Sequence, residues 1–345
     1  MWPLGAWLKR EPPASSERRS DSIMNSLWKR DFMVLTIVIV NWNTREDLLP
    51  CLESIQANLG GVPSEVWVVD NGSKDGSIEA VRQRYPWAIT VANGRNEGFA
   101  KAANQALKEM KGRYALLLNP DTQLKGGGIE RLISFMETHP EAGVAGPQLL
   151  NSDGSKQNSI ANFPSLTTEF LNKRLLRWLL PRRFPGKERI YTDPVEVDSV
   201  IGACMMVRGD ALRQVGLLDE SYFLFLEETD WCYRIKKAGW KIYHVPQAEI
   251  VHFQGKSAGA EKAKARVEYY RSRNTFFKKH RGPLQWVVLL LGGLIRLSFE
   301  LAVTAVVCVA TLFTIKKWRR RFSIYAYLLW WHLRLCPKGM GLREG

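Results

Sequence analysis

Three acidic side chains lie within four positions of the chain, at Glu227, Glu228 and Asp230, with Trp231 beside them. On a helix, Glu227 and Asp230 share one face while Glu228 points elsewhere. Acids at the start of a helix often only balance its dipole. Residues 221–226 before them are largely apolar, however, and exposed capping acids rarely follow such a run. A carboxylate whose pKa is raised by this setting can act as a general base, which contributes roughly 10²–10⁴ in rate.

Two more polar clusters follow runs of residues that are typical of buried strands. Asp70 and Asn71 follow the run Glu65–Val69, and Asn119-Pro120-Asp121 follows the run Tyr114–Leu118. The Asp70 carboxylate can accept hydrogen bonds from a ribose or a base, and Asp121 can ligate a hard cation that balances a diphosphate. The alternative is that both clusters are ordinary turns that leave a strand, where Asx residues and Asn-Pro are common.

His252 is a third kind of candidate. It lies near the end of a predicted strand and is followed by Gln254, Gly255 and Lys256. A lone histidine is more often a structural residue than a ligand. The flexible, basic continuation favours a loop that closes over phosphates. This makes a ligand role for His252 more plausible than it is for a histidine without such a neighbour.

The elements that must position these residues alternate along the first half of the chain. Strands are predicted at Leu35–Val40, Glu65–Val69, Ala88–Ala92, Tyr114–Leu118, Val197–Val207, Lys241–His244 and Glu249–Phe253. Helices are predicted near residues 47–58, 77–85, 101–110 and 227–238. This alternation predicts an α/β fold with a mostly parallel sheet flanked by helices. Ligands of such sheets bind beyond the carboxyl ends of the strands, where the polar clusters lie.

The ordered set of motifs over residues 34–280 resembles family 2 glycosyltransferases, specifically the bacterial rhamnosyltransferase-like branch. The matching segments are Thr36–Asn43, Val69–Ser77, Asn96–Ala100 with Asn104, Asn119–Asp121, Gly202–Arg208, Asp219-Glu220, Glu227–Trp231 and His252. Each motif is weak alone, but their order and spacing are highly specific. The resemblance implies a GT-A fold, a nucleotide-diphosphate sugar as donor, and a divalent metal.

The resemblance also implies roles for single residues. Nucleotide-sugar binding is expected of Asn41, Asn43, Asp70, Asn71, Asn96, Gly98, Asn104, Asn119 and Asp121. Asp121 takes the place of the last acid in the family's metal-binding DxD motif, and His252 looks like a further metal ligand. Imidazole with carboxylate and phosphate oxygens fits Mn²⁺ or Mg²⁺. Asn119 stands where the fuller pattern has an acid, which leaves fewer charged ligands for the metal.

The family's catalytic base is the second acid of a Glu-Asp pair, and this position is Glu228. Glutamate reaches farther than aspartate, so the backbone must lie slightly farther from the acceptor. The implied reaction is a single in-line displacement with inversion, in which Glu228 takes the proton of an acceptor hydroxyl. Glu227 as the base, and Asp230 or Trp231 as catalytic or acceptor-binding residues, stay open as alternatives.

Positive charge gathers at the C-terminal end of the chain. Residues 256–345 carry 18 Lys and Arg against 4 Asp and Glu, which accounts for +14 of the total net charge of +15. The basic residues flank apolar runs within residues 284–335. This arrangement favours contact with membrane lipids over nucleic acid. We therefore expect no nucleic-acid partner.

Residues 297–315 approach the roughly 20 residues that span a bilayer. Basic clusters lie on both sides of residues 284–315. By the positive-inside rule both flanks prefer the cytoplasm, which favours a re-entrant hairpin within 284–315 or an in-plane helix over a single span. A helix packed on the catalytic domain is the alternative. We expect the protein at the cytoplasmic face of the inner (plasma) membrane.

Three parts are predicted along the chain. They are a disordered extension at residues 1–32, a GT-A catalytic domain at 33–282 with a nucleotide-sugar half at 33–125 and an acceptor half at 126–282, and a basic, apolar, membrane-associated helical region at 283–345. The extension lacks the apolar segment of a signal peptide, and Met24 or Met33 is an alternative start. Five dispersed cysteines without CxxC spacing indicate a reducing compartment.

A function follows as a hypothesis: transfer of a sugar, with rhamnose as the family-level expectation, to a saccharide or lipid-linked saccharide in cell-surface polysaccharide synthesis. A catalytically silent membrane-docking protein that keeps the nucleotide-binding fold is the alternative, and Asn119 is its best support. Nucleotidyl transfer is disfavoured, because Asn41–Thr44 is not the Gly-rich basic loop which that chemistry needs after the first strand. The sequence leaves the donor, the acceptor, the linkage and the oligomeric state open.

Overall fold

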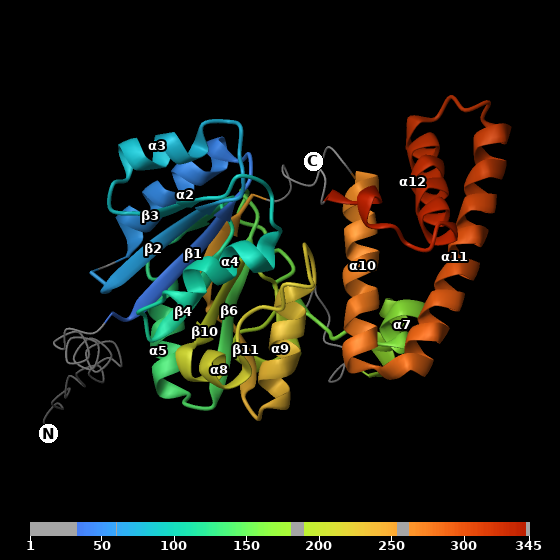
Figure 1. Cartoon of the computed structure of the whole chain (residues 1–345). Coiled ribbons are helices and arrows are strands. Elements are labelled where there is room, and N and C mark those ends of the chain that lie inside the picture. The colour runs from blue at the N-terminus through green and yellow to red at the C-terminus, as the bar shows by residue number, and fades with distance from the viewer. Residues whose placement is uncertain (1–32, 60, 181–189, 254–261, 343–345) are drawn as a thin grey trace, which may run out of the picture. The chain divides into compact units, whose positions relative to one another are not determined.

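The computed structural model describes residues 33–59, 61–180, 190–253 and 262–342 (Figure 1). The expectations for residues 1–32 and for the loop after His252 lie outside these residues. The strands are β1 Leu35–Asn41, β2 Ser64–Asp70, β3 Ile89–Ala92, β4 Tyr114–Leu118, β5 Thr122–Leu124, β6 Ala142–Leu150, β7 Ile160–Ala161, β8 Val195–Glu196, β9 Ser199–Val200, β10 Cys204–Arg208 and β11 Lys241–His252.

The helices cover the sheet and continue beyond it. They are α2 Arg45–Asn58, α3 Ser77–Arg84, α4 Phe99–Lys108, α5 Gly128–Thr138, α6 Leu166–Phe170, α7 Lys173–Leu179, α8 Gly209–Val215, α9 Glu227–Lys237, α10 Lys262–His280, α11 Gly282–Ala310 and α12 Lys316–Leu333, with a 3₁₀ turn at Lys338–Met340.

The main sheet has the strand order β3-β2-β1-β4-β10-β6-β11-β5, and β8 pairs with β11. Strands β3, β2, β1 and β4 run parallel. Strand β10 is antiparallel to β4 and β6, whereas β11 is parallel to β6. The α/β fold is confirmed, and its nucleotide-side half is parallel as predicted. The other half is mixed, because β10 enters in the opposite direction.

Strand β1 shows why the sheet is covered on both faces. Successive side chains of a strand point to opposite faces. Val38 and Val40 pack in a core cluster with α4, α8 and α9, while Ile37 and Ile39 point the other way and are also fully buried. A strand buried on both faces requires a continuous apolar run, which is the pattern of residues 35–40.

One predicted strand is wrong. Val197–Val207 does not form a single strand, since β9 ends at Val200 and β10 begins at Cys204. Gly202 lies in the turn between them, and a Cβ atom there would be 3.3 Å from Cγ of Glu228. The chain leaves the extended conformation at Gly202 because α9 packs closely against it.

The two predicted strands Lys241–His244 and Glu249–Phe253 are one strand, β11. The register of its pairing with β6 shifts between Val245 and Glu249. Pro246 lies inside this irregularity. Proline has no backbone N–H, and here none is needed for a regular hydrogen-bond ladder between β11 and β6. The proline therefore marks a bulge and not the end of a strand.

The helical region consists of α10, α11 and α12, which contact one another (Figure 1). Helix α11 is continuous over 29 residues, so the hairpin expected within residues 284–315 is wrong. Gly292 lies inside this continuous helix. A Cβ there would be 2.5 Å from the Phe170 ring, so the glycine lets α6 approach α11. The chain instead turns between α11 and α12. Away from this turn, Leu297 of α11 packs with Leu328 and Trp331 of α12.

Candidate active site

The carboxyl ends of β1 and β2 carry the first polar cluster. Asn41 and Asp70 are paired in the parallel register, and Asn41 Nδ2 donates to Asp70 Oδ1 at 2.8 Å. The other oxygen of Asp70 accepts the backbone N–H of Ser73 at 2.9 Å. Both residues are buried. These bonds fix the Asp70 carboxylate and the turn that follows it.

Asn71 and Asn96 form the next layer of this edge. Asn71 Nδ2 donates to Asn96 Oδ1 at 2.8 Å, and the same oxygen accepts the N–H of Gly98 at 3.0 Å. Gly98 has a φ of +87°, and a Cβ there would be 2.7 Å from Phe223. Only glycine fits this position, because both the conformation and the space exclude a side chain.

A cavity of about 310 Å³ opens in front of these residues, and we call it the donor cavity. Six of the residues predicted for donor or metal binding line it: Asn71, Asn96, Gly98, Asn119, Asp121 and His252. Trp42, Phe99 and Phe225 add aromatic walls. A cavity with apolar walls and a few convergent polar groups is typical of a site for a nucleotide.

Four other residues predicted for nucleotide binding are not in this lining, although all belong to the described part of the chain. Asn41 and Asp70 lie beneath it, and Asn43 is exposed and accepts the N–H of Lys74 at 2.7 Å. Asn104 is buried, and its side chain donates to Leu218 O at 2.9 Å and accepts the Leu218 N–H at 3.1 Å. In this structure Asn104 ties α4 to a distant loop.

Asp121 and His252 are brought together by the antiparallel pairing of β5 and β11. His252 pairs with Thr122, the backbone N–H of Phe253 donates to Asp121 O at 2.9 Å, and His252 Nε2 lies 3.3 Å from Asp121 Oδ1. The other ring nitrogen, Nδ1, lies 3.0 Å from Gln157 Oε1. An amide oxygen only accepts, so Nδ1 donates to Gln157, and Nε2 faces the Asp121 carboxylate.

Asp121 and His252 are side chains of the types that hold divalent metals such as Mn²⁺ and Mg²⁺. A second group that fixes the tautomer of a histidine, as Gln157 does here, is typical of metal-ligating histidines. Among the described residues there is no cluster of three His, Cys, Asp or Glu side chains with metal-binding spacing. Mg²⁺-type sites often take only one or two protein ligands and complete their shell with substrate phosphates and water. Asp121 and His252 fit that pattern.

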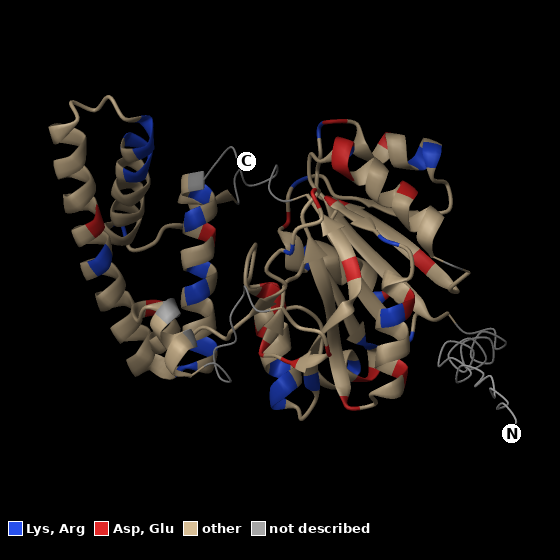
Figure 2. Cartoon of the chain, turned by 180° about the vertical axis from the view of Figure 1, so that it is seen from behind, with Lys and Arg blue, Asp and Glu red and all other residues tan. Residues whose placement is uncertain are grey.

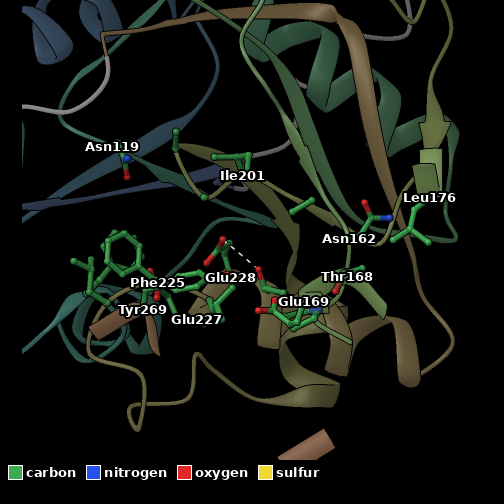
Figure 3. A pocket seen from close by; sticks show the side chains of 18 residues that line it. Asn119, Asn162, Thr168, Glu169, Leu176, Ile201, Phe225, Glu227, Glu228 and Tyr269 are labelled. Carbon is green, nitrogen blue, oxygen red and sulfur yellow. Dashed lines mark hydrogen bonds between the residues drawn. The ribbon is translucent and has the colours of Figure 1, made fainter. Parts of the chain in front are cut away.

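A second cavity of about 470 Å³ adjoins the donor cavity, and we call it the acceptor cavity. Phe99, Asn119, Leu224 and Phe225 line both. Glu227 and Glu228, from the first turn of α9, are among the side chains that line the acceptor cavity, and Figure 3 shows them with Glu169 and Tyr269. The carboxylates therefore line the cavity that adjoins the donor cavity.

Burial raises the pKa of both glutamates above the ordinary range. For Glu228 the cause is desolvation, which hydrogen bonds from its own backbone and Thr229 partly offset. For Glu227 desolvation acts first and the nearby Glu228 charge adds to it, so its pKa is raised well above the ordinary value. Glu227 Oε2 is buried without a hydrogen-bond partner in the described structure. Both glutamates therefore hold their protons to a higher pH than an exposed glutamate does.

The turn before α9 carries backbone strain. Phe225 and Leu226 are consecutive residues with φ of 69° and 65°. Non-glycine residues in this region cost about 1–3 kcal/mol each and are concentrated at functional sites. The two strained residues turn the chain so that α9 begins with Glu227 and Glu228 at the cavity.

Asp230 and Trp231, the other two predicted candidates on α9, are not in the lining of either cavity. Asp230 is fully buried and accepts bonds from Arg234, Lys279 and His280 at 2.7 Å each. Trp231 is fully buried in the core, and its Nε1 donates to Gly216 O at 2.9 Å. The structure thus brings Glu227 and Glu228 to the cavity and turns Asp230 and Trp231 into the protein.

Several lining or supporting residues were missed in the sequence. Gln157 supports His252 across 95 positions of the chain. Thr168 and Glu169 come from the short helix α6, and Tyr269 comes from α10. None of them stands in a motif, and only the Ser165 capping box at the start of α6 gives a local signal.

Known proteins resemble this chain in sequence and in fold. The family model described as glycosyl transferase family 2 matches residues 36–216. An N-acetylglucosaminyl-diphospho-decaprenol L-rhamnosyltransferase of Mycobacterium tuberculosis is 32% identical over 74% of this chain and 89% of its own length. The rhamnosyltransferase WbbL of Escherichia coli K12 is 27% identical over 63% and 82%.

A solved structure gives the likeness in fold. The mannosyltransferase PcManGT from Pyrobaculum calidifontis, in complex with GDP-Man and Mn²⁺, matches 92% of this chain and 95% of its own with a TM-score of 0.53 and 16% identity. This likeness concerns the fold, which is the GT-A fold expected from the motifs. The family model covers more than half of the chain, and the Mycobacterium relative matches most of both proteins. The chain belongs to glycosyl transferase family 2, in its rhamnosyltransferase-like branch, and is a glycosyltransferase.

Proposed function

We propose that this enzyme transfers L-rhamnose, with inversion, from a nucleotide-diphosphate donor to a hydroxyl of a lipid-linked saccharide. One observation carries the proposal. The donor cavity with Asp121 and His252 adjoins the acceptor cavity with Glu228, and the two share Asn119 and Phe225. A donor and an acceptor that occupy them meet at the boundary, which is the arrangement that a direct transfer requires.

The donor cavity binds the nucleotide-diphosphate sugar. Asn71 and Asn96 offer amide groups, and Trp42, Phe99 and Phe225 offer apolar surface. Asp121 and His252 would hold a divalent cation, Mn²⁺ or Mg²⁺, which would supply Lewis-acid neutralisation of charge on the leaving diphosphate. With Asn119 in place of an acid, fewer charged ligands hold the ion, so we expect weaker metal binding than in a site with two acids.

Glu228 takes the proton from the acceptor hydroxyl. A base must be ionised to act, and burial raises the pKa of Glu228 above the ordinary range. Its raised pKa also makes the ionised carboxylate a stronger base. The displaced nucleotide leaves on the side of the donor cavity, opposite the attacking oxygen, and this inverts the anomeric centre.

The acceptor lies at a membrane surface. Helix α11 is long and apolar enough to cross a bilayer, and only 22% of its most apolar window is buried. Its exposed side chains include Leu284, Leu291, Ile295, Phe299 and Val306. Helix α12 starts with a basic cluster, Lys316, Lys317 and Arg319–Arg321, which is visible as blue ribbon in Figure 2. Apolar and basic surface in sequence fits a bilayer with anionic lipids.

We place the enzyme at the cytoplasmic face of the membrane, because the basic clusters on both sides of α11 favour that side. The Mycobacterium relative is named for a decaprenol-linked acceptor, and a substrate of that class resides in a membrane. The rhamnosyl donor follows from the names of both relatives.

The experiment is a donor screen with the purified full chain, Mn²⁺ and a short-chain isoprenyl diphosphate that carries N-acetylglucosamine. Released nucleoside diphosphate and the glycosylated product are measured for dTDP-rhamnose and for UDP- and GDP-sugars. We expect product with dTDP-rhamnose and the opposite anomeric configuration in the new bond. Binding of nucleotide without turnover of any donor contradicts the proposal and favours a silent docking protein.

A further inference from the structure

We propose that a third cavity, beside the acceptor cavity, binds the diphosphate of the lipid-linked acceptor; this inference rests on the sugar transfer proposed above. The cavity has a volume of about 230 Å³ and is lined by residues of α6, α10, α11 and α12. Three arginines line it, Arg266, Arg273 and Arg296, and we call it the arginine cavity. None of them belongs to a motif considered above.

Arg273 is the central observation. Its residue is only 6% exposed, and its Nη1 donates to Glu169 Oε2 at 3.0 Å. Its Nε and Nη2 are buried and have no hydrogen-bond partner among the described residues. Leaving charged donors unpaired in the interior is costly. The Arg273 side chain is among those that line the cavity, and the fork of a guanidinium matches the oxygens of a phosphate.

The other lining groups complete a site for a phosphate ester. Arg266 and Arg296 add two cations, and Arg296 Nη1 donates to the backbone oxygen of Glu169 at 3.2 Å. Glu169 and Glu300 also line the cavity, so the formal charge of the lining is +1. Glu169 is already paired with Arg273, so one of the two acids of the lining is balanced within the lining itself. Tyr270 and Tyr325 bring hydroxyl groups to the same cavity.

The position of the cavity identifies the ligand. Thr168, Glu169 and Tyr269 line both the arginine cavity and the acceptor cavity that holds Glu228. On the other side, Arg296 and Glu300 belong to α11, whose neighbouring Ile295 and Phe299 are 73% and 68% exposed. The order is therefore a carboxylate base, then arginines, then exposed apolar helix. A saccharide, a diphosphate and an isoprenoid chain follow each other in the same order in a lipid-linked acceptor.

The first test measures binding without turnover. Equilibrium dialysis of farnesyl diphosphate against the full chain in neutral detergent, with no donor and no metal, reports on the arginine cavity alone. We expect Arg273→Gln and Arg296→Gln each to weaken binding about tenfold or more, as for lost hydrogen bonds to a charged group. Arg296 is exposed, so its variant stays informative if Arg273→Gln does not fold. Arg334→Gln, an exposed arginine outside the cavity, is the matched control.

The second test compares two acceptors with the same donor. One is the short-chain isoprenyl diphosphate with N-acetylglucosamine, and the other is octyl β-N-acetylglucosaminide, which has no phosphate. We expect Arg296→Gln to raise KM only for the diphosphate acceptor and to leave KM for the donor unchanged. Equal farnesyl diphosphate binding by variant and wild type overturns the inference, even where transfer occurs. If the wild type binds farnesyl diphosphate and the arginine variants bind it more weakly, but no sugar is transferred, the proposed function is contradicted and the inference is supported.

A phospholipid headgroup is the competing source of phosphate. If the two variants keep their affinity for farnesyl diphosphate but bind phosphatidylglycerol vesicles more weakly, the cavity holds headgroups and the inference is wrong. If vesicle binding is unchanged while farnesyl diphosphate binding falls, the acceptor diphosphate is the ligand.

Discussion

His280 Nε2 donates to the buried carboxylate of Asp230 at 2.7 Å, and this bond joins α10 to α9, the helix that carries Glu228. Lys279 and Arg234 bond to the same carboxylate. These partners lower the pKa of Asp230 below the ordinary range, although its burial alone acts in the opposite direction. Helices α9 and α10 are thus joined through one fully buried acid.

The first prediction concerns this acid. Asp230→Asn removes a buried charge that several cations face, so we expect a loss of about 3–5 kcal/mol in the free energy of unfolding. Urea unfolding followed by far-UV circular dichroism measures it. Asp210→Asn is the matched control, since Asp210 pairs with Arg213 at an exposed position and costs at most about 1 kcal/mol. A variant as stable as the wild type contradicts the structural role of Asp230.

The second prediction concerns the metal. Gln157→Leu removes the group that holds Nδ1 of His252, and we expect the Mn²⁺ concentration for half-maximal activity to rise about 10–100-fold. Activity at saturating Mn²⁺ should be largely kept. Gln214→Leu serves as the control, because Gln214 lines neither the donor cavity nor the acceptor cavity and its side chain accepts a hydrogen bond from Trp240. Unchanged half-saturation in Gln157→Leu shows that His252 is not a ligand.

The third prediction concerns the membrane. Replacing Arg319, Arg320 and Arg321 by Gln removes three exposed cations, each of which adds about 1 kcal/mol near anionic headgroups. We expect binding to phosphatidylglycerol vesicles to weaken about a hundredfold, with little change for phosphatidylcholine. Co-sedimentation measures both. A triple variant at Arg82, Arg84 and Arg131, all exposed on the catalytic domain, is the control. Equal effects in both triple variants contradict a specific basic surface on α12.

The fourth prediction is a pH dependence. The pKa of Glu228 is raised from the ordinary 4.5 by desolvation, and the base acts only when it is ionised. Activity should therefore fall as the pH is lowered through this raised pKa. The decrease in kcat/KM should occur at a higher pH than it would with an exposed glutamate as the base. Steady-state rates across the acidic range, with protein stability checked in parallel, measure this. An acidic limb at or below 4.5 disagrees with a buried base.

The sequence predicted the parts of the fold that depend on local pattern. Strand β4 has the predicted bounds, Tyr114–Leu118, because a short apolar run between turn residues has few other solutions. The break at Gly202 was not predicted, since it depends on the approach of Glu228 from α9. The continuity of β11 was not predicted either, because the bulge at Pro246 is set by the pairing with β6.

The candidate site divides in the same way. Asp121, Glu227, Glu228 and His252 stand in motifs, and the structure places them at two adjoining cavities. Gln157 and Arg273 stand in no motif, because their partners His252 and Glu169 are 95 and 104 positions away. Asp230 belongs to the same motif as Glu228. Only the position of α10 reveals that Asp230 is buried and accepts hydrogen bonds from Lys279 and His280. Pairings over such distances leave no local pattern in a single sequence.

The most direct test of the account compares Glu228→Gln with Glu227→Gln in the same transfer assay. Both variants keep the shape of the side chain and remove the ability to take a proton. We expect Glu228→Gln to lower kcat by about 10²–10⁴ with little change in KM for the donor, and Glu227→Gln to lose far less. Full activity of Glu228→Gln, together with inactivity of Glu227→Gln, would contradict the assignment of Glu228 as the base.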